Sequence, residues 1–177
     1  ILAMGGDGTL LHTIRVIEGK SIPILGINLG SLGFLTEVTE KEIYFTLENI
    51  LQGHYKIEKR MMLSIKVIRQ GSVLVRFKAL NEAVITESEI ARMINLKVAI
   101  DAEYLTTYRA DGLIISTPTG STGYSLAAGG PIVVPQMMVL MLTPVCPHTL
   151  TARPMIIPES SRITVDVVSS EQSVLTI

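Results

Sequence analysis

Three glycines within four positions directly follow an apolar run at the start of the chain. The run, Ile1-Leu2-Ala3-Met4, predicts a buried strand, and Gly5-Gly6-Asp7-Gly8-Thr9 predicts the tight turn that ends it. Apolar residues then recur at helical spacing, at Leu10, Ile14 and Ile17. A strand, a glycine loop and a helix start in this order form the carboxyl edge of a parallel sheet, where α/β proteins bind their ligands.

Asp7 is the unusual residue of this loop. Free N–H groups at a helix start attract anions, whereas a carboxylate repels phosphate. The loop therefore suits a hydroxyl that is positioned for attack on a phosphate, or a Mg²⁺ ion that bridges phosphates. Spacing alone leaves one alternative open, a structural turn in which Asp7 caps the helix and the glycines permit the bend.

The apolar pattern continues as an α/β pattern up to about residue 55. Residues 22–27 predict a second buried strand, and residues 28–35 predict a loop whose glycines suit a backbone that lines a ligand site. Thr39-Glu40-Lys41-Glu42 has the spacing of a capping box and opens a helix that Gly53 ends. We therefore expect residues 1–55 to form an α/β nucleotide-binding piece, an incomplete part of a doubly wound sheet.

After that point the apolar period changes from about 3.6 to 2. Alternating runs separated by a turn predict hairpins at residues 63–79 and 94–107, and another alternating run predicts a strand at 163–167. Antiparallel strands with one apolar face pack in layers around a shared core. We expect residues 56–177 to form a β-rich, sandwich-like domain, so the predicted fold class is α/β plus all-β.

A dense run of hydroxyls and glycines occupies residues 116–131, directly after the apolar strand Leu113-Ile114-Ile115. Within it a short helix is expected, on which Tyr124 is available to pack against a flat base. Asn81-Glu82 interrupts the alternation earlier in the chain, and an amide beside a carboxylate suits ribose hydroxyls and a base edge. Each motif alone is also compatible with an ordinary turn. The length of the hydroxyl run indicates a binding site.

Composition narrows the class of protein. The net charge is −1, so no basic field favours nucleic acid, and no apolar run approaches the roughly 18 residues of a membrane span. Cys146 is the single cysteine; it suits a reducing compartment, here the cytoplasm, and its apolar neighbours suggest a core position. Because the chain opens and stops within apparent strands, we expect a fragment of a longer protein.

Taken together, the motifs resemble the NAD kinase family. Gly-Gly-Asp-Gly-Thr is also found in lipid kinases and phosphofructokinases, which likewise transfer phosphoryl groups to hydroxyls, but the other motifs are not. The resemblance covers essentially the whole chain, and in that family an α/β domain and a β-rich domain meet over the substrate. The motifs that carry it lie at residues 5–9, 32–34, 81–82, 111–131, 143–148 and 153–154.

This resemblance implies a reaction and its partners. The γ-phosphoryl group of ATP, or in some members polyphosphate, passes to the 2′-hydroxyl of the adenosine ribose of NAD and gives NADP. Mg²⁺ or another divalent cation bridges the donor phosphates. Family members work as homo-oligomers, dimers or tetramers, and the resemblance implies neither a nucleic-acid nor a membrane partner.

The resemblance also implies roles for individual residues. Asp7 matches the catalytic carboxylate, and no side chain is expected to be a dedicated metal ligand. His12 stands where relatives often carry a basic residue, Gly123 where Ala is common and Ala127 where Ser is common, so these contacts differ from the family pattern. The implied substrate-binding residues are Gly8, His12, Phe34, Asn81, Glu82, Arg92, Arg109, Asp111, Thr122, Gly123, Tyr124, Ser125 and Ala127.

Two other functions remain open at this point. A non-catalytic NAD(P)-binding or regulatory module would keep the binding motifs without turnover. A lipid kinase is disfavoured, because residues 111–131 have no counterpart in those enzymes. Analysis of the product formed from NAD, ATP and Mg²⁺ separates the three.

Overall fold

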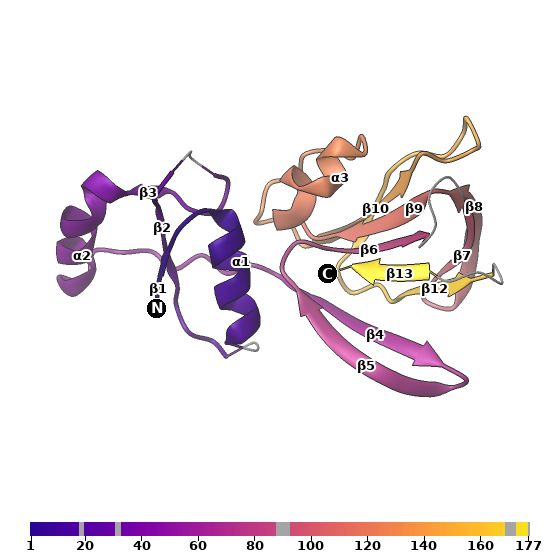
Figure 1. The fold of residues 1–177 in the computed structure, drawn as a ribbon, viewed down its shortest axis with the longest axis horizontal. Helices are drawn as coiled ribbons and strands as arrows, with labels where there is room; N and C mark the ends of the chain where they lie inside the picture. The colour runs from indigo at the N-terminus through magenta and orange to yellow at the C-terminus, as the bar shows by residue number, and fades with distance from the viewer. Residues whose placement is uncertain (18–19, 31–32, 88–92, 169–172, 177) are drawn as a thin grey trace. The chain divides into compact units, whose positions relative to one another are not determined.

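The computed structural model describes residues 1–17, 20–30, 33–87, 93–168 and 173–176. The chain divides into two units, Ile1–Lys59 and Arg60–Ile177 (Figure 1). The first unit is α/β and the second is β-rich, which confirms the predicted fold class. None of the helices in these described ranges is long and apolar enough to cross a membrane.

A three-stranded parallel sheet forms the centre of the first unit, in the order β1-β2-β3. Its core contains Ala3, Leu10 and Ile27, which are at most 8% exposed. The strands are β1 (Leu2–Met4), β2 (Leu25–Asn28) and β3 (Val38–Thr39), and the helices are α1 (Asp7–Val16), the 3₁₀ turn η1 (Glu40–Glu42) and α2 (Ile43–Leu51).

Two predictions about these strands are corrected. In the described part of the chain β1 pairs with β2 alone, so Leu2 and Met4 remain about half exposed (50% and 51%) rather than buried. The second strand begins at Leu25 and not at Ile22. The physical reason is Pro23, which has no N–H to donate to the ladder. Its carbonyl accepts a hydrogen bond from the amino group of Ile1 (2.9 Å), and the N–H of Leu25 then donates to the carbonyl of Ile1 (2.9 Å).

The predicted capping box is confirmed. Glu42 Oε2 accepts hydrogen bonds from the hydroxyl of Thr39 (2.6 Å) and from its backbone N–H (3.0 Å). These two bonds lower the pKa of Glu42, the hydroxyl contributing most. Gly53, two residues beyond the end of α2, has a φ of +81°, a left-handed conformation that favours glycine at a helix end.

In the described part of the second unit all strand pairs are antiparallel. They form a five-stranded sheet in the order β11-β10-β9-β6-β13, a three-stranded sheet in the order β12-β7-β8, and the hairpin β4-β5. The strands are β4 (Leu63–Arg69), β5 (Ser72–Ala79), β6 (Glu82–Glu87), β7 (Ile94–Ile100), β8 (Glu103–Ala110), β9 (Gly112–Ser116), β10 (Val139–Val145), β11 (Met155–Pro158), β12 (Ile163–Val167) and β13 (Ser173–Thr176).

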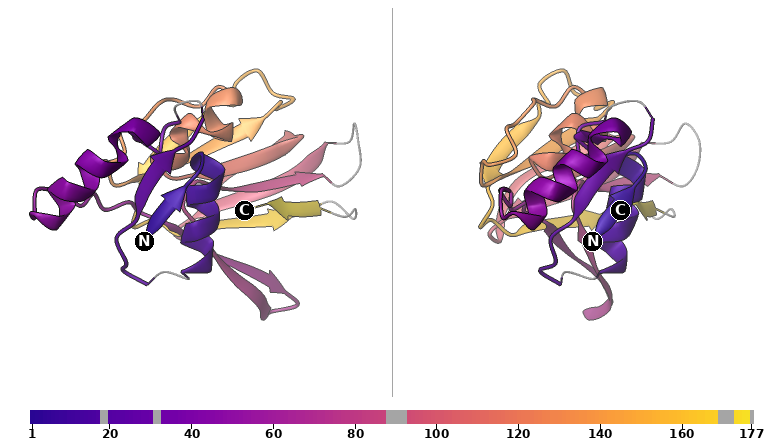
Figure 2. Two further views of the ribbon diagram at one scale, coloured as in Figure 1. Left: turned by 60° about the vertical axis from the view of Figure 1, so that its left-hand side comes forward. Right: turned by 90° about the vertical axis from the view of Figure 1, so that its left-hand side faces the viewer.

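The two larger sheets share one hydrophobic core. Figure 2 shows the ribbon of their strands from two further sides. Leu96 and Val98 of β7 belong to the same buried cluster as Leu113 of β9 and Leu142 of β10, and all four are fully buried. This is the sandwich-like arrangement that the alternating runs predict. The predicted hairpins correspond to β4-β5 and β7-β8, and the predicted strand at 163–167 corresponds to β12.

Candidate functional site

The hydroxyl-rich run begins at the end of β9, the central strand of the five-stranded sheet. The chain turns there into the 3₁₀ helix η2 (Thr119–Thr122) and the short helix α3 (Tyr124–Ala127), which confirms the helix expected within the run. In Figure 1, α3 lies beside the ends of β9 and β10.

Most hydroxyls of this run hold the loop in place. Thr117 Oγ1 donates to the carbonyl of Leu80 (2.5 Å), and Ser121 Oγ donates to the carbonyl of Val133 (3.1 Å) while accepting its N–H (3.0 Å). Ser125 Oγ is fully buried and lies 2.9 Å from Thr143 Oγ1. The run is therefore a rigid platform, and the hydroxyl of Ser125, a predicted binding residue, is engaged within the fold.

Asn81 and Glu82 differ from these satisfied hydroxyls. The backbone of Asn81 is fixed, since its carbonyl accepts the N–H of Thr117 (2.8 Å). Yet Asn81 Oδ1 and Glu82 Oε2 are buried and have no hydrogen-bond partner within the described residues. Buried polar atoms almost always have a partner. An unsatisfied pair on adjacent residues therefore indicates a place for the polar groups of a ligand.

The predicted residues at 81–82 and 122–127 belong to one place in the fold. A Cβ atom added to Gly123 would lie 3.2 Å from Glu82 Oε2, so the glycine that departs from the family pattern leaves room beside the carboxylate. Next to it Tyr124 is 45% exposed, Thr122 is partly buried and Ala127 is exposed. The site thus combines an unsatisfied carboxyl and amide with an accessible aromatic ring.

In the α/β unit, Asp7 is the first residue of α1 but does not cap it. The N-cap is Gly6, and no side chain caps this helix. The carboxylate of Asp7 instead accepts backbone hydrogen bonds from the loop that follows β2. Their donors are the N–H groups of Phe34 (2.8 Å), Leu35 (3.1 Å) and Thr36 (3.2 Å). The alternative in which Asp7 is only a helix cap is wrong.

Close approach of the loop to Asp7 requires a glycine. A Cβ atom added to Gly33 would overlap the carboxylate of Asp7. Any other residue there would push the loop away from its acceptor. The glycine at this position, which the sequence suggests as part of a backbone lining a ligand site, serves the approach of the backbone to Asp7.

Two further residues of this site were missed by the sequence analysis. Thr36 Oγ1 lies 3.2 Å from Asp7 Oδ1 and accepts a hydrogen bond from Asn28 Nδ2 (2.9 Å). Both side chains are buried, with 0% exposed for Thr36 and 4% for Asn28. The only available signal was the place of Asn28 at the end of an apolar strand, where ligand-binding residues collect in α/β sheets.

The remaining predicted binding residues within the described ranges lie on the surface, where the structure gives no contact that indicates a ligand. Gly8, His12, Phe34, Arg109 and Asp111 are all exposed, and Phe34 has 67% of its surface accessible. Their binding roles stay predictions. Arg92 lies outside the described residues.

Cys146 is not in the core. It follows β10 and is exposed, which corrects the core position expected from its neighbours. Its φ of +46° is a left-handed conformation, in a bend directly after the end of β10.

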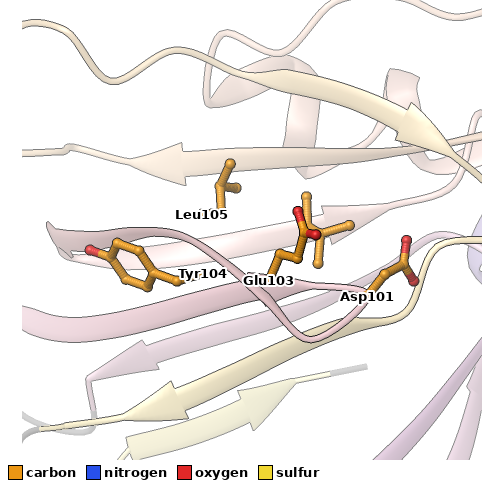
Figure 3. Close-up of a pocket in the computed structure, with 5 residues that line it drawn as sticks. Asp101, Glu103, Tyr104 and Leu105 are labelled. Atoms are coloured by element: carbon orange, nitrogen blue, oxygen red, sulfur yellow. The ribbon is translucent and has the colours of Figure 1, made fainter.

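A separate pocket lies at the turn between β7 and β8, lined by Ile100, Asp101, Glu103, Tyr104 and Leu105 (Figure 3). Asp101 Oδ1 accepts the N–H of Arg162 (2.8 Å), so its carboxylate joins the turn to the segment before β12. No predicted binding residue lines this pocket, and we assign it no role in the site.

The pKa of Glu82 gives the site a measurable signature. Burial raises this pKa above its ordinary value of 4.5, so the folded state favours the protonated carboxyl. Folding is therefore favoured by the protonated form of Glu82. This contribution to the free energy of unfolding is fully present below pH 4.5 and is lost as the pH rises through the raised pKa. We expect Glu82→Gln to be more stable than wild type at neutral pH and similar to it below pH 4.5, in urea unfolding.

The matched control is Glu159→Gln, which changes an exposed glutamate. We expect its stability to follow that of wild type at both pH values. An equal gain in the two variants, or a gain for Glu82→Gln that does not depend on pH, would contradict the burial of an unsatisfied carboxyl.

Both units of the chain are similar to known proteins. The family model of the ATP-NAD kinase N-terminal domain matches residues 1–55, and that of the ATP-NAD kinase C-terminal domain matches residues 80–177. The NAD kinase of Geobacter metallireducens is 50% identical over 98% of this chain, and that of Moorella thermoacetica is 54% identical over 93%. The chain spans 61% and 53% of the length of these two relatives.

Two solved structures with a similar fold are kinases in complex with a nucleotide. Yeast NADH kinase complexed with NADH has a TM-score of 0.94 and 35% identity, over 99% of this chain and 52% of the yeast chain. An NAD kinase from Archaeoglobus fulgidus in complex with ATP has a TM-score of 0.80 and 26% identity, over 99% of this chain and 72% of the archaeal chain. From the two family models and these relatives together, the chain belongs to the ATP-NAD kinase family.

Proposed function

We propose that the protein containing this chain transfers the γ-phosphoryl group of ATP to the 2′-hydroxyl of the adenosine ribose of NAD, giving NADP. The observation that carries the proposal is the fixed carboxylate of Asp7 in a glycine loop at a helix start. Membership of the ATP-NAD kinase family supports it. So do the NADH bound to the yeast relative and the ATP bound to the archaeal relative.

One oxygen of the Asp7 carboxylate is available to the acceptor hydroxyl. Oδ1 accepts three hydrogen bonds, from the N–H groups of Leu35 and Thr36 and from the Thr36 hydroxyl, whereas Oδ2 accepts one, from the N–H of Phe34. Each carboxylate oxygen has about two lone-pair sites. Oδ2 therefore keeps a site at which the ribose hydroxyl donates its proton.

The reaction then needs little covalent chemistry from the protein. The 2′-oxygen forms a bond to the γ-phosphorus, the bond from that phosphorus to the β,γ-bridging oxygen breaks, and ADP leaves with that electron pair. The hydroxyl proton passes to Asp7 late, because the transition state is loose and the attacking oxygen keeps its proton until then. Positioning and charge neutralisation supply most of the rate, and a positioned base adds about 10²–10⁴-fold.

Mg²⁺ enters this scheme with ATP. No group of three or more histidine, cysteine, aspartate or glutamate side chains within the described ranges is arranged to hold a metal ion. In kinases Mg²⁺ is commonly held mainly by the phosphates of the nucleotide, and we propose the same here. Bound there, it would neutralise charge on the donor phosphates.

The β-rich unit supplies groups for the dinucleotide. Asn81 Oδ1 and Glu82 Oε2 lack partners among the described residues and can accept hydrogen bonds from ribose hydroxyls or a base amino group. Tyr124, with 45% of its surface exposed, offers a face for a base to stack on. The other proposed binding residues of this unit are Arg92, Arg109, Asp111, Thr122, Gly123, Ser125 and Ala127, and those of the α/β unit are Gly8, His12 and Phe34.

The assembly and the compartment are also proposals. We propose a homo-oligomer, as the family resemblance implies. The exposed thiol of Cys146 suits a reducing compartment, and we propose the cytoplasm.

Product analysis of the full-length protein tests the reaction. Incubation with NAD, ATP and Mg²⁺ is expected to give NADP and ADP in equal amounts. Asp7→Asn should lower kcat at least about 10²-fold, the low end for loss of a positioned base, and leave NAD affinity within about tenfold. The measurement is initial-rate kinetics with calorimetric binding of NAD.

Asp166→Asn, which changes an exposed aspartate of β12, is the control and should keep full kcat. If Asp7→Asn retains more than about a tenth of wild-type kcat, the role of Asp7 is wrong. A wild-type protein that binds NAD but forms no NADP would instead identify a non-catalytic binding module.

Stacking on Tyr124 gives a separate expectation. Tyr124→Ala should weaken NAD binding by about 1–3 kcal/mol, the range for loss of one base–aromatic stack. Tyr104→Ala, at a tyrosine that is 62% exposed on β8, is the matched control and should bind as wild type does. Calorimetry that finds unchanged affinity in folded Tyr124→Ala would leave this ring without a binding role.

A further inference from the structure

We propose that Thr36, oriented by Asn28, is a positioning residue for Asp7 in the proposed phosphoryl transfer. The three side chains form a chain of hydrogen bonds from Asn28 Nδ2 to Thr36 Oγ1 (2.9 Å) and from Thr36 Oγ1 to Asp7 Oδ1 (3.2 Å). Neither Asn28 nor Thr36 needs to touch a substrate for this role. The inference rests on the proposed function, because it assigns the role through the reacting carboxylate.

The donor and the acceptor can be assigned for each hydrogen bond that links Asn28, Thr36 and Asp7. The backbone N–H of Gly30 can only donate, and it lies 2.8 Å from Asn28 Oδ1. This contact fixes which end of the amide is oxygen, so the Nδ2 group faces Thr36 and donates to its hydroxyl. A hydroxyl has one hydrogen, and with Asn28 as its donor the Thr36 hydroxyl directs that hydrogen to Asp7 Oδ1.

The consequence is a difference between the two oxygens of Asp7. The Thr36 hydroxyl is the third donor to Oδ1, which has about two lone-pair sites, so this oxygen is saturated. Among the described residues, Oδ2 has the N–H of Phe34 as its single donor. The Thr36 hydroxyl therefore joins the three backbone N–H donors in holding the plane of the carboxylate, and in the proposed reaction this arrangement leaves Oδ2 for the acceptor hydroxyl. Orientation of this kind is a large part of catalysis when the chemistry itself is loose.

The methyl group of Thr36 has a packing role that can be separated from the role of the hydroxyl. A Cβ atom added to Gly26 would lie 2.9 Å from Thr36 Cγ2, so the threonine methyl group covers the glycine of β2. The methyl group packs, and the hydroxyl binds Asp7. Thr36→Val removes the hydroxyl and keeps the packing volume, whereas Thr36→Ser keeps the hydroxyl and removes the methyl group. The two variants distinguish a positioning role from a structural one.

The test measures kcat, KM for NAD and thermal stability in the full-length protein. Thr36→Val should lower kcat about tenfold or more, as expected for loss of a hydrogen bond to a charged group, and change KM less than about threefold. Thr36→Ser should keep kcat within about threefold of wild type although its packing is weaker. Thr39→Val, which removes another hydroxyl of the same unit, is the control and should keep wild-type kcat.

Asn28→Asp provides an independent test if Thr36→Val does not fold. Its carboxylate still accepts the N–H of Gly30 but cannot donate to Thr36, so it competes with Asp7 for the single hydrogen of the Thr36 hydroxyl. We expect a loss of kcat similar to that of Thr36→Val. The double variant should lose little more than either single one, since both interrupt the same chain.

The outcomes separate this inference from the proposed function. Wild-type kcat in Thr36→Val or in Asn28→Asp would overturn the positioning role while leaving the kinase function intact. Equal losses of kcat in Thr36→Ser and Thr36→Val would assign Thr36 to packing and also overturn it. A wild-type protein that forms no NADP would contradict the proposed function itself.

Discussion

The hydrogen bonds between the carboxylate of Asp7 and the loop at residues 34–36 are the interaction on which the α/β unit depends. Three consecutive backbone N–H groups of that loop have this one side chain as their acceptor. Backbone donors outside regular structure need partners, and hydrogen bonds to a charged acceptor are worth about 1.5–3 kcal/mol each. The helix start, the loop after β2 and Gly33 are therefore one structure, and changing any part moves the carboxylate.

In the β-rich unit, most polar side chains near the proposed site are hydrogen-bonded within the fold, and two are not. There the hydroxyls of Thr117, Ser121 and Ser125 are satisfied inside the fold, and they build a rigid platform at the end of β9. Against that satisfied background the unsatisfied atoms of Asn81 and Glu82 stand out among the described residues. A buried polar atom without a partner is costly, so its presence marks a place where a ligand completes the hydrogen bonding.

The sequence correctly predicted those elements that are determined by residues close together in the chain. The alternation at 63–79 became the hairpin β4-β5, and Thr39 and Glu42 form the expected capping box. Features set by distant contacts were not predictable in this way. The bond from Thr36 to Asp7 spans 29 residues, and no spacing rule pairs them. The exposure of Leu2 and Met4 depends on which strands flank β1, and that of Cys146 on a turn with positive φ.

Amide hydrogen exchange tests most directly whether Asp7 holds the loop. In the full-length protein, the N–H groups of Phe34, Leu35 and Thr36 should exchange at least about tenfold faster in Asp7→Ala than in wild type, as expected for loss of a charged acceptor. The N–H of Arg162, which donates to Asp101, is the internal reference and should exchange at the same rate in both. Equal rates at residues 34–36 in the two proteins would contradict the account.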